Sequence, residues 1–292
     1  MIGRTVSRYR IIAKLGEGGM GSVWKAEDPL LGRTLALKFL PESLCAQQDA
    51  RARFLREAQS ASALAHSGIA TVYDAGESDG MVYIALQHVD GETVAQRIER
   101  GRVEVMEASR IAMEAAEALG HAHEHGVLHR DVTSRNIMVS RDGRVIVVDF
   151  GLARSTEAEP ESATVTEGTP YYVAPEKIKR EKETFLSDMY SLGCTLYHAL
   201  TGHVPFEAPT VEELVAAHVH TPLTPPNMVV TDITQSTSDA LVKVMQKNPA
   251  DRFLSYDEFS MALWAARSQL LVQQSLEADQ PKPKSKTSWW RR

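Results

Sequence analysis

Cysteine is scarce in this sequence: Cys45 and Cys194 are the only two among 292 residues, and they lie far apart along the chain. Such a pair offers no disulfide framework and is typical of a protein in a reducing compartment such as the cytosol. Long hydrophobic runs are lacking too, because no stretch of about 18 apolar residues occurs that could span a membrane. The opening residues, 1–10, are too polar for a secretory signal peptide. We therefore expect a cytoplasmic protein.

An excess of positive charge is also missing. The net charge is −6 and the pI is near 6.0, whereas a protein that binds nucleic acid usually presents a strongly basic face. We therefore expect no nucleic-acid partner. The hydrophobic share of 43% and the charged share of 24% are ordinary for a globular protein and argue against global disorder.

The hydrophobic pattern changes character near residue 87. Before it, short β-like runs bounded by glycine or proline surround one helical pattern at 51–64, and after it helical patterns dominate. The sequence therefore predicts an α+β fold with two lobes, a small β-rich N-lobe with one helix and a larger, mainly α-helical C-lobe. The expected segments are an N-terminal arm at 1–8, the N-lobe at 9–86, the hinge and C-lobe at 87–271 and a flexible basic tail at 272–292. Helices of the C-lobe are expected at 92–100, 105–125, 186–200, 211–219, 236–246 and 255–271.

The last residues, 280–292 (QPKPKSKTSWWRR), are polar, basic and punctuated by proline. This composition is typical of a flexible tail. Trp289 and Trp290, beside lysine and arginine, also suit an anionic membrane interface. Two interpretations stay open: a disordered end, and a juxtamembrane segment that holds the chain at the inner face of the membrane. Membrane contact is expected through this tail alone.

A glycine-rich motif lies at residues 16–21 (GEGGMG). It matches GxGxxG, a pattern that also opens dinucleotide-binding helices. Here a β-like run at 22–26 follows it, not a helix. Glycines between two strands form a hairpin that can lie over phosphates, with its N–H groups close to their oxygens. A plain glycine-rich hairpin is the alternative.

Lys38 ends the apolar run Leu35-Ala36-Leu37. Because burial of an unpaired ammonium group is costly, this lysine needs an anion. Glu57, on the helix expected at 51–64, is a candidate that could hold Lys38 towards the α- and β-phosphates of a nucleotide. A lysine that reaches solvent is the alternative.

Two aspartates and an amide occur within a short span. Residues 129–136 read HRDVTSRN, and Asp149 follows the apolar run 145–148 and precedes Phe150-Gly151. Magnesium prefers hard oxygen ligands, which Asn136 and Asp149 provide. Asp131 can orient an attacking hydroxyl and accept its proton. A single aspartate in a turn is usually only a turn residue, but the joint occurrence in this order argues against coincidence.

In these residues the chain resembles the eukaryotic-type (Hanks-type) protein kinase family, specifically its bacterial serine/threonine kinases. The resemblance implies transfer of the γ-phosphate of ATP to protein hydroxyls, with Mg²⁺ as the metal ion and Mn²⁺ as an alternative, and with proteins as substrates. It covers about Tyr9 to Leu271 and rests on the ordered set of the glycine loop, Lys38, Glu57, the His-Arg-Asp loop, Asp149-Phe150-Gly151, Ala174-Pro175-Glu176, Asp188 and Arg252.

The resemblance also implies residue roles. Leu86 is the expected gatekeeper, the backbone of Gln87 and Val89 is expected to meet the adenine edge, and Glu176 is expected to form a buried ion pair with Arg252. The implied catalytic residues are Asp131, Lys38, Glu57, Asn136, Arg135 and Thr169, the implied ATP-binding residues are Leu15, Gly16, Gly18, Gly21, Val23, Ala36, Lys38, Leu86, Gln87, Val89, Met138 and Asp149, and the implied metal ligands are Asn136 and Asp149.

One residue departs from the family pattern. The serine/threonine branch usually carries lysine two residues after the catalytic aspartate, where this chain has Thr133. Arg135 stands where tyrosine kinases often place an arginine and could supply the missing cation. By contrast, Gly168-Thr169 resembles serine/threonine kinases, with Thr169 expected to contact Asp131. We give this segment more weight; a pseudokinase scaffold and a tyrosine or dual-specificity kinase stay open as alternatives.

The segment at 154–167 is rich in serine, threonine and glutamate. Phosphate on Thr164 or Thr166 could pair with Arg130 and order this segment. We therefore expect autophosphorylation of the activation loop, for which a homodimer that reacts in trans is one arrangement. A solvated acidic loop without modification is the alternative.

Overall fold

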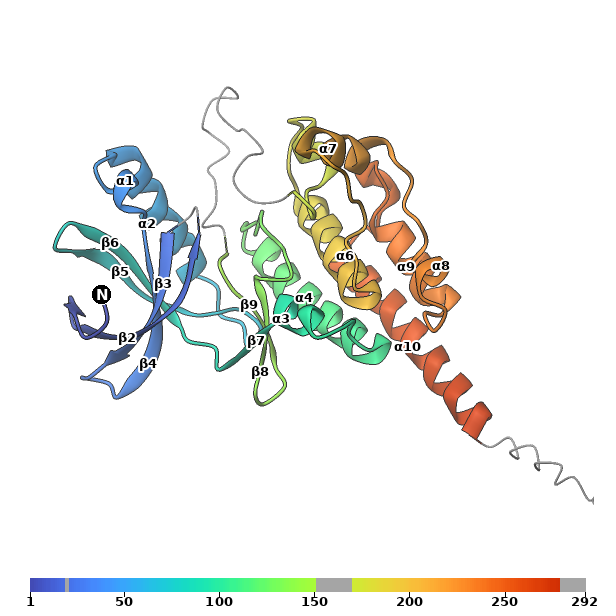
Figure 1. Cartoon of the computed structure of the whole chain (residues 1–292), viewed down its shortest axis with the longest axis horizontal. Helices are drawn as coiled ribbons and strands as arrows, with labels where there is room; N and C mark the ends of the chain where they lie inside the picture. The colour runs from blue at the N-terminus through green and yellow to red at the C-terminus, as the bar shows by residue number, and fades with distance from the viewer. Residues whose placement is uncertain (19–20, 151–169, 279–292) are drawn as a thin grey trace, which may run out of the picture.

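The structure is a computed structural model, and it describes residues 1–18, 21–150 and 170–278. Within these residues the chain forms two lobes, one built on a curled sheet and one mainly helical (Figure 1). The predicted α+β bilobal fold is therefore confirmed.

The N-lobe is an antiparallel sheet of strand order β1-β2-β3-β4-β6-β5. Side chains alternate along β4, so that Leu35 and Leu37 pack on one side of the sheet, while Ala36 packs on the other with Phe54 of α2. Lys38 follows the same alternation and lies on the side that faces α2. The elements are β1 (Thr5–Val6), β2 (Tyr9–Gly18), β3 (Gly21–Asp28), β4 (Arg33–Phe39), α1 (Glu42–Cys45), α2 (Gln48–Ser62), β5 (Val72–Ser78) and β6 (Met81–Gln87).

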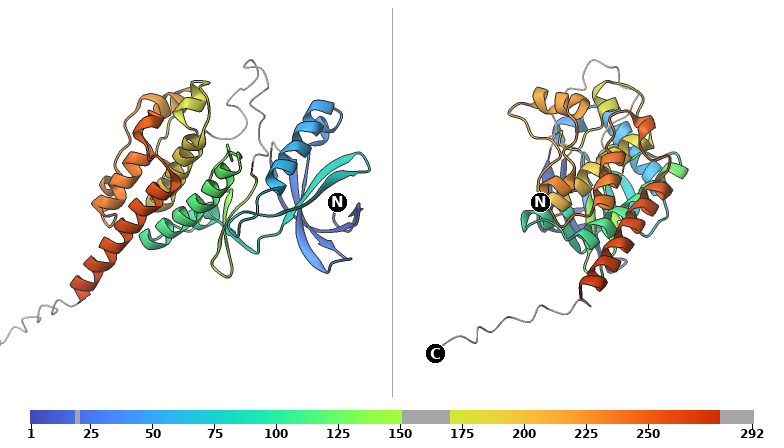
Figure 2. Two further views of the ribbon diagram at one scale, coloured as in Figure 1. Left: turned by 180° about the vertical axis from the view of Figure 1, so that it is seen from behind. Right: turned by 90° about the vertical axis from the view of Figure 1, so that its right-hand side faces the viewer.

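The C-lobe joins a small antiparallel sheet, β7-β8-β9, to a bundle of helices. Figure 1 shows this sheet between the N-lobe and the helices. Alanines such as Ala112, Ala115 and Ala116 allow α4 to lie in the centre of the core, and α10 packs along it (Figure 2). The elements are β7 (Gly91–Thr93), α3 (Val94–Glu99), α4 (Val105–Glu124), β8 (Ile137–Ser140), β9 (Val145–Val147), α5 (Pro175–Ile178), α6 (Phe185–Thr201), α7 (Val211–His220), α8 (Pro226–Val229), α9 (Gln235–Val244), a 3-10 helix (Pro249–Asp251) and α10 (Tyr256–Ala278).

Two element boundaries differ from the sequence predictions. Residues 272–278, expected in the flexible tail, continue α10 as far as Ala278. No glycine or proline interrupts this stretch, and its leucine, glutamine and alanine are good helix formers. The helix expected from residue 92 begins at Val94, because Thr93 ends β7 and caps α3 with its side chain. Among the described helices, none is long and apolar enough to cross a membrane.

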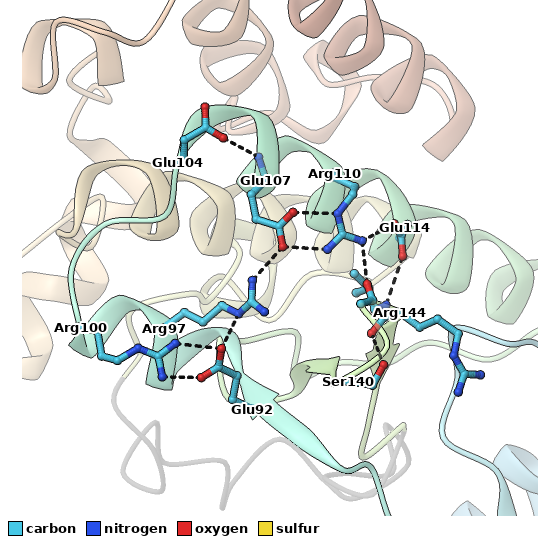
Figure 3. A network of polar contacts seen from close by, with 11 residues as sticks. Glu92, Arg97, Arg100, Glu104, Glu107, Arg110, Glu114, Ser140 and Arg144 are labelled. Carbon is cyan, nitrogen blue, oxygen red and sulfur yellow. Dashed lines mark hydrogen bonds and ion pairs between the residues drawn. The ribbon is translucent and has the colours of Figure 1, made fainter.

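A network of ion pairs links the small sheet to the helices behind it (Figure 3). Arg97 of α3 contacts Glu92 at 2.9 Å and Glu107 of α4 at 2.8 Å. Arg110, also on α4, contacts Glu107 and donates to the carbonyl of Gly143 in the β8–β9 turn at 2.9 Å. The network therefore fixes β7 and the β8–β9 hairpin against α4.

Candidate active site

The residues implied for adenine binding come from both lobes. Ala36 lies opposite Leu86 in the β4–β6 pairing, and each is 8% exposed. Val23 packs with them from β3, whereas Met138 of β8 packs with Val89 in a separate apolar cluster. Apolar side chains from the N-lobe sheet and from the C-lobe hairpin could thus pack against the two faces of a flat ring.

The backbone between the lobes offers a donor for such a ring. The Gln87 N–H already donates to the Thr71 carbonyl at 2.8 Å. For the Val89 N–H, no acceptor is found among the described residues. Of these two implied hinge residues, Val89 therefore retains its backbone donor for a purine nitrogen.

The glycine motif forms a hairpin, as predicted, since the β2–β3 pairing continues to Gly18 and Gly21. Gly21 has a φ of 114°, and a Cβ built on it would lie 1.9 Å from the carbonyl oxygen of Phe39. No atom of the described residues lies within 4 Å of a Cβ built on Gly16 or Gly18. Gly21 is thus required by the fold, whereas Gly16 and Gly18 leave open space above the hairpin. Leu15, just before the motif, is 49% exposed.

Lys38 finds its anion in Asp149, not in Glu57. Lys38 is 4% exposed, and its Nζ lies 3.1 Å from Asp149 Oδ1. Among the described contacts no ion pair joins Lys38 to Glu57, so the expected pair is not formed in this structure. Burial raises the pKa of Glu57 to about 7, although the charge of Lys38 acts to lower it. The N-lobe lysine instead contacts a carboxylate of the C-lobe.

The catalytic loop is held by Asp188 of α6. Its two carboxylate oxygens accept the backbone N–H groups of His129 and Arg130, each at 2.7 Å. His129 Nδ1 accepts the Asp131 N–H at 3.2 Å, which leaves Nε2 to donate to the Val148 carbonyl at 2.9 Å. His129 therefore joins the loop that carries Asp131 to the strand end that precedes Asp149.

Asn136 and Asp131 form the centre of the site. Asn136 Nδ2 donates to the Asp131 carbonyl and to Asp131 Oδ2, both at 2.9 Å. Because its amide nitrogen is used in this way, the Oδ1 of Asn136 remains as a ligand for a cation. Asp149 has a φ of 62°, in the left-handed region that aspartate adopts more readily than most residues with a Cβ.

The donor set fits a magnesium ion that arrives with a nucleotide. An amide oxygen of Asn136 and a carboxylate of Asp149 are the hard ligands that this ion prefers, and it commonly takes its other ligands from phosphates and water. In the described part of the chain, no group of three or more His, Cys, Asp or Glu side chains could hold a metal ion.

The predicted Glu176–Arg252 ion pair is confirmed. Arg252 donates to both carboxylate oxygens of Glu176, at 2.7 and 2.8 Å, and the two side chains are 0% and 3% exposed. Burial alone would raise the pKa of Glu176, but the hydrogen bonds and charge of Arg252 outweigh it and lower that pKa. This bidentate pair fixes the start of α5 to the loop before α10.

Sequence reasoning missed two groups beside the catalytic loop. Tyr172 joins Ser134 to His198 of α6 through its hydroxyl, at 2.9 and 2.8 Å. Lys177 of α5 donates to the carbonyl of Arg130 at 2.8 Å. Neither contact has a signal in the linear motif, because each joins segments far apart in sequence.

The remaining implied residues are placed as follows. Arg135 is exposed, and its backbone N–H donates to Thr133 Oγ1 at 3.3 Å. Thr169, Thr164 and Thr166 lie outside the described residues.

Comparison with known proteins finds relatives over most of the chain. The family model described as protein kinase domain matches residues 9–264. The chain is 37% identical over 268 residues to a probable serine/threonine-protein kinase PknB of Corynebacterium glutamicum, covering 88% of this chain and 42% of that protein. It is 38% identical over 254 residues to the serine/threonine-protein kinase PknB of Mycolicibacterium smegmatis, covering 84% of this chain and 41% of that protein. The chain thus spans about two fifths of the length of these relatives.

A solved structure shares the fold. The crystal structure of the Mycobacterium tuberculosis PknI kinase domain matches with a TM-score of 0.74 at 30% sequence identity. The match covers 92% of this chain and 99% of that one.

Proposed function

Because the chain belongs to the protein kinase domain family, we propose that it transfers the γ-phosphate of ATP to serine or threonine hydroxyls of proteins. One observation carries the proposal: Lys38 of the N-lobe lies against Asp149 of the C-lobe, and His129 joins Val148, the residue before Asp149, to the loop that carries Asp131. A fixed cation, two carboxylates and an amide are the groups that phosphoryl transfer requires.

The proposed roles are those that membership of the protein kinase domain family implies. Lys38 binds the α- and β-phosphates, and Asn136 and Asp149 hold a magnesium ion, for which manganese is an alternative. When bound, the ion screens the negative charge of the phosphates. Asp131 Oδ2 accepts from Asn136, and Asp131 Oδ1, which accepts no hydrogen bond from the residues that the structure describes, is proposed to meet the acceptor hydroxyl.

The serine/threonine preference is supported by the relatives, which are named serine/threonine-protein kinases. Arg135 is proposed to supply the cation that Thr133 does not, because its side chain is exposed beside the loop. A pseudokinase scaffold is disfavoured, since Lys38, Asp131, Asn136 and Asp149 are all present. Arg135 favours a tyrosine or dual-specificity kinase as the second candidate.

Partners and location are part of the same proposal. We expect protein substrates, autophosphorylation of the activation loop, and a homodimer as one arrangement in which that reaction runs in trans. The catalytic chain is proposed to work in the cytoplasm, with membrane contact through the basic residues 280–292.

Phosphosite mapping tests the proposal. The protein is incubated with Mg²⁺, ATP and a generic basic protein, and phosphosites are located by mass spectrometry, with Asp131→Asn as the control that keeps side-chain size. Phosphoserine or phosphothreonine is expected with the wild type and not with the variant. Phosphotyrosine would support the second candidate, and no transfer would support a pseudokinase.

A further inference from the structure

The peptide bond between Arg130 and Asp131 is held at both ends by side chains. Its carbonyl oxygen accepts a hydrogen bond from Lys177 Nζ at 2.8 Å. Its N–H, which belongs to Asp131, donates to His129 Nδ1 at 3.2 Å. Because the orientation of a peptide plane sets the direction in which the next side chain leaves the backbone, these contacts help to aim the Asp131 carboxylate.

The backbone held in this way is strained. Arg130 has a φ of 65°, in the left-handed region that disfavours residues with a Cβ. Such a conformation persists only where surrounding contacts hold it. The Asp188 carboxylate accepts a hydrogen bond from the Arg130 N–H at 2.7 Å, and Lys177 Nζ donates one to the Arg130 carbonyl.

Lys177 is itself well anchored. It follows Glu176 in α5, and the buried ion pair of Glu176 with Arg252 fixes that helix. The Nζ of Lys177 also lies 3.3 Å from Glu183 Oε2, and the two side chains are 28% and 16% exposed. The ammonium group therefore sits between one carboxylate and one backbone carbonyl, in a largely enclosed position.

We propose that Lys177 is a positioning residue for phosphoryl transfer: its ammonium group holds the Arg130–Asp131 peptide so that the Asp131 carboxylate faces the acceptor hydroxyl. The proposal rests on the proposed kinase function. It gives α5, which follows the activation loop in the chain, a direct contact with the catalytic loop. Lys177 acts through the backbone and is not expected to touch the nucleotide.

Steady-state kinetics of Lys177→Met test this role, since methionine keeps the side-chain stem and lacks the donor. We expect kcat to fall by about tenfold to a hundredfold, the range that a small misplacement of a catalytic group produces. The KM for ATP and the Kd for Mg²⁺–ADP, measured by calorimetry, should stay within about twofold. Lys177→Arg, which retains a donor, should recover most of the rate.

Matched variants separate positioning from simple stabilisation. Glu183→Gln removes the ion pair but leaves the contact of Lys177 with Arg130, and Lys179→Met removes an exposed lysine at the end of the same helix. Lys179→Met should keep the wild-type kcat. Glu183→Gln, whose amide oxygen can still accept a hydrogen bond from Lys177, should lose far less of the rate than Lys177→Met. If Lys177→Met does not fold, Lys177→Met/Glu183→Gln replaces it, because no carboxylate is then left unpaired.

Three results would overturn the inference while the kinase function stands: a wild-type kcat for Lys177→Met, an equal loss for Glu183→Gln, or a nucleotide affinity that falls in step with kcat. An inactive wild-type protein would instead overturn the proposed function itself.

Discussion

Glu57 has a carboxyl group whose pKa lies near neutrality, because burial raises it to about 7 against the opposing charge of Lys38. Below that pH it is a neutral acid, and above it a carboxylate that this arrangement does not pair with Lys38. The net charge of the groups beside Lys38 therefore changes within the physiological pH range.

The effect on stability follows from proton linkage. The pKa of Glu57 is about 7 in the folded chain against an ordinary value of 4.5, so the folded state binds more protons between these limits. The stability that this group contributes is present below about pH 4.5 and is lost as pH rises through about 7. We expect the wild-type Tm to fall more between pH 5 and 8 than that of Glu57→Gln, whose amide does not titrate.

Thermal melts of both proteins across this range measure the difference. Glu77→Gln, which removes a carboxyl exposed on β5, is the control and should follow the wild type. If plots of Tm against pH were parallel for the wild type and Glu57→Gln, the carboxyl of Glu57 would titrate at its ordinary pKa.

At the scale of elements, the β2–β3 hairpin separates two uses of glycine. At Gly21 the sheet requires a φ of 114° and brings the Phe39 carbonyl close to the backbone, so that the fold itself needs glycine there. The open space around Gly16 and Gly18 belongs to the surface that would face phosphates. We therefore propose that glycine serves the fold at Gly21 and the approach of a ligand at Gly16 and Gly18.

Substitution by alanine should separate these uses. Gly21→Ala is expected to lower the free energy of unfolding by about 2 kcal/mol or more, because the new Cβ meets a backbone oxygen in a left-handed conformation. Gly18→Ala should unfold as the wild type does but bind Mg²⁺–ATP more weakly, since its methyl group would stand between the backbone and the phosphates. Urea unfolding and nucleotide titration of both variants provide the test, and equal unfolding curves would contradict it.

At the scale of the whole molecule, the contact of Lys38 with Asp149 joins the two lobes. A nucleotide that binds both lobes should stabilise the folded chain by mass action, by about 2.7 kcal/mol at a concentration of 100 times its Kd. Because Asp149 is a proposed metal ligand, the Mg²⁺-dependent part of this stabilisation should be lost in Asp149→Asn.

Melting curves with ADP, in the presence and absence of Mg²⁺, measure the Mg²⁺-dependent stabilisation directly. Asp142→Asn, which changes an exposed aspartate in the β8–β9 turn, is the control and should retain the Mg²⁺-dependent shift. An Mg²⁺-dependent rise in Tm that is unchanged in Asp149→Asn would remove Asp149 from the metal site.

Local patterns were sufficient to predict much of this molecule. Alternating and helical periods predicted two lobes, and the glycine motif between β-like runs predicted a hairpin. The pair of Glu176 with Arg252 was also anticipated, although the two residues are 76 positions apart, because the family resemblance supplied what local pattern does not contain.

Contacts between distant segments depend on tertiary structure. Lys177 reaches Arg130 across 47 positions, and only the packing of α5 against the catalytic loop brings them together. Residues 272–278 show the reverse case, in which helix-forming residues continue α10 beyond the end predicted from hydrophobic periodicity.

The sequence by itself determined which side chains are available for chemistry and on which side of a strand or helix each lies, because these follow from backbone periods of 2.0 and about 3.6 residues. Only the tertiary structure decided which charge Lys38 meets. The sequence offers two carboxylates, Asp149 and Glu57, as partners for Lys38. The positions of the C-lobe and of α2 relative to β4 determine which of them lies within reach, and the cost of burying an unpaired charge requires that one of them does.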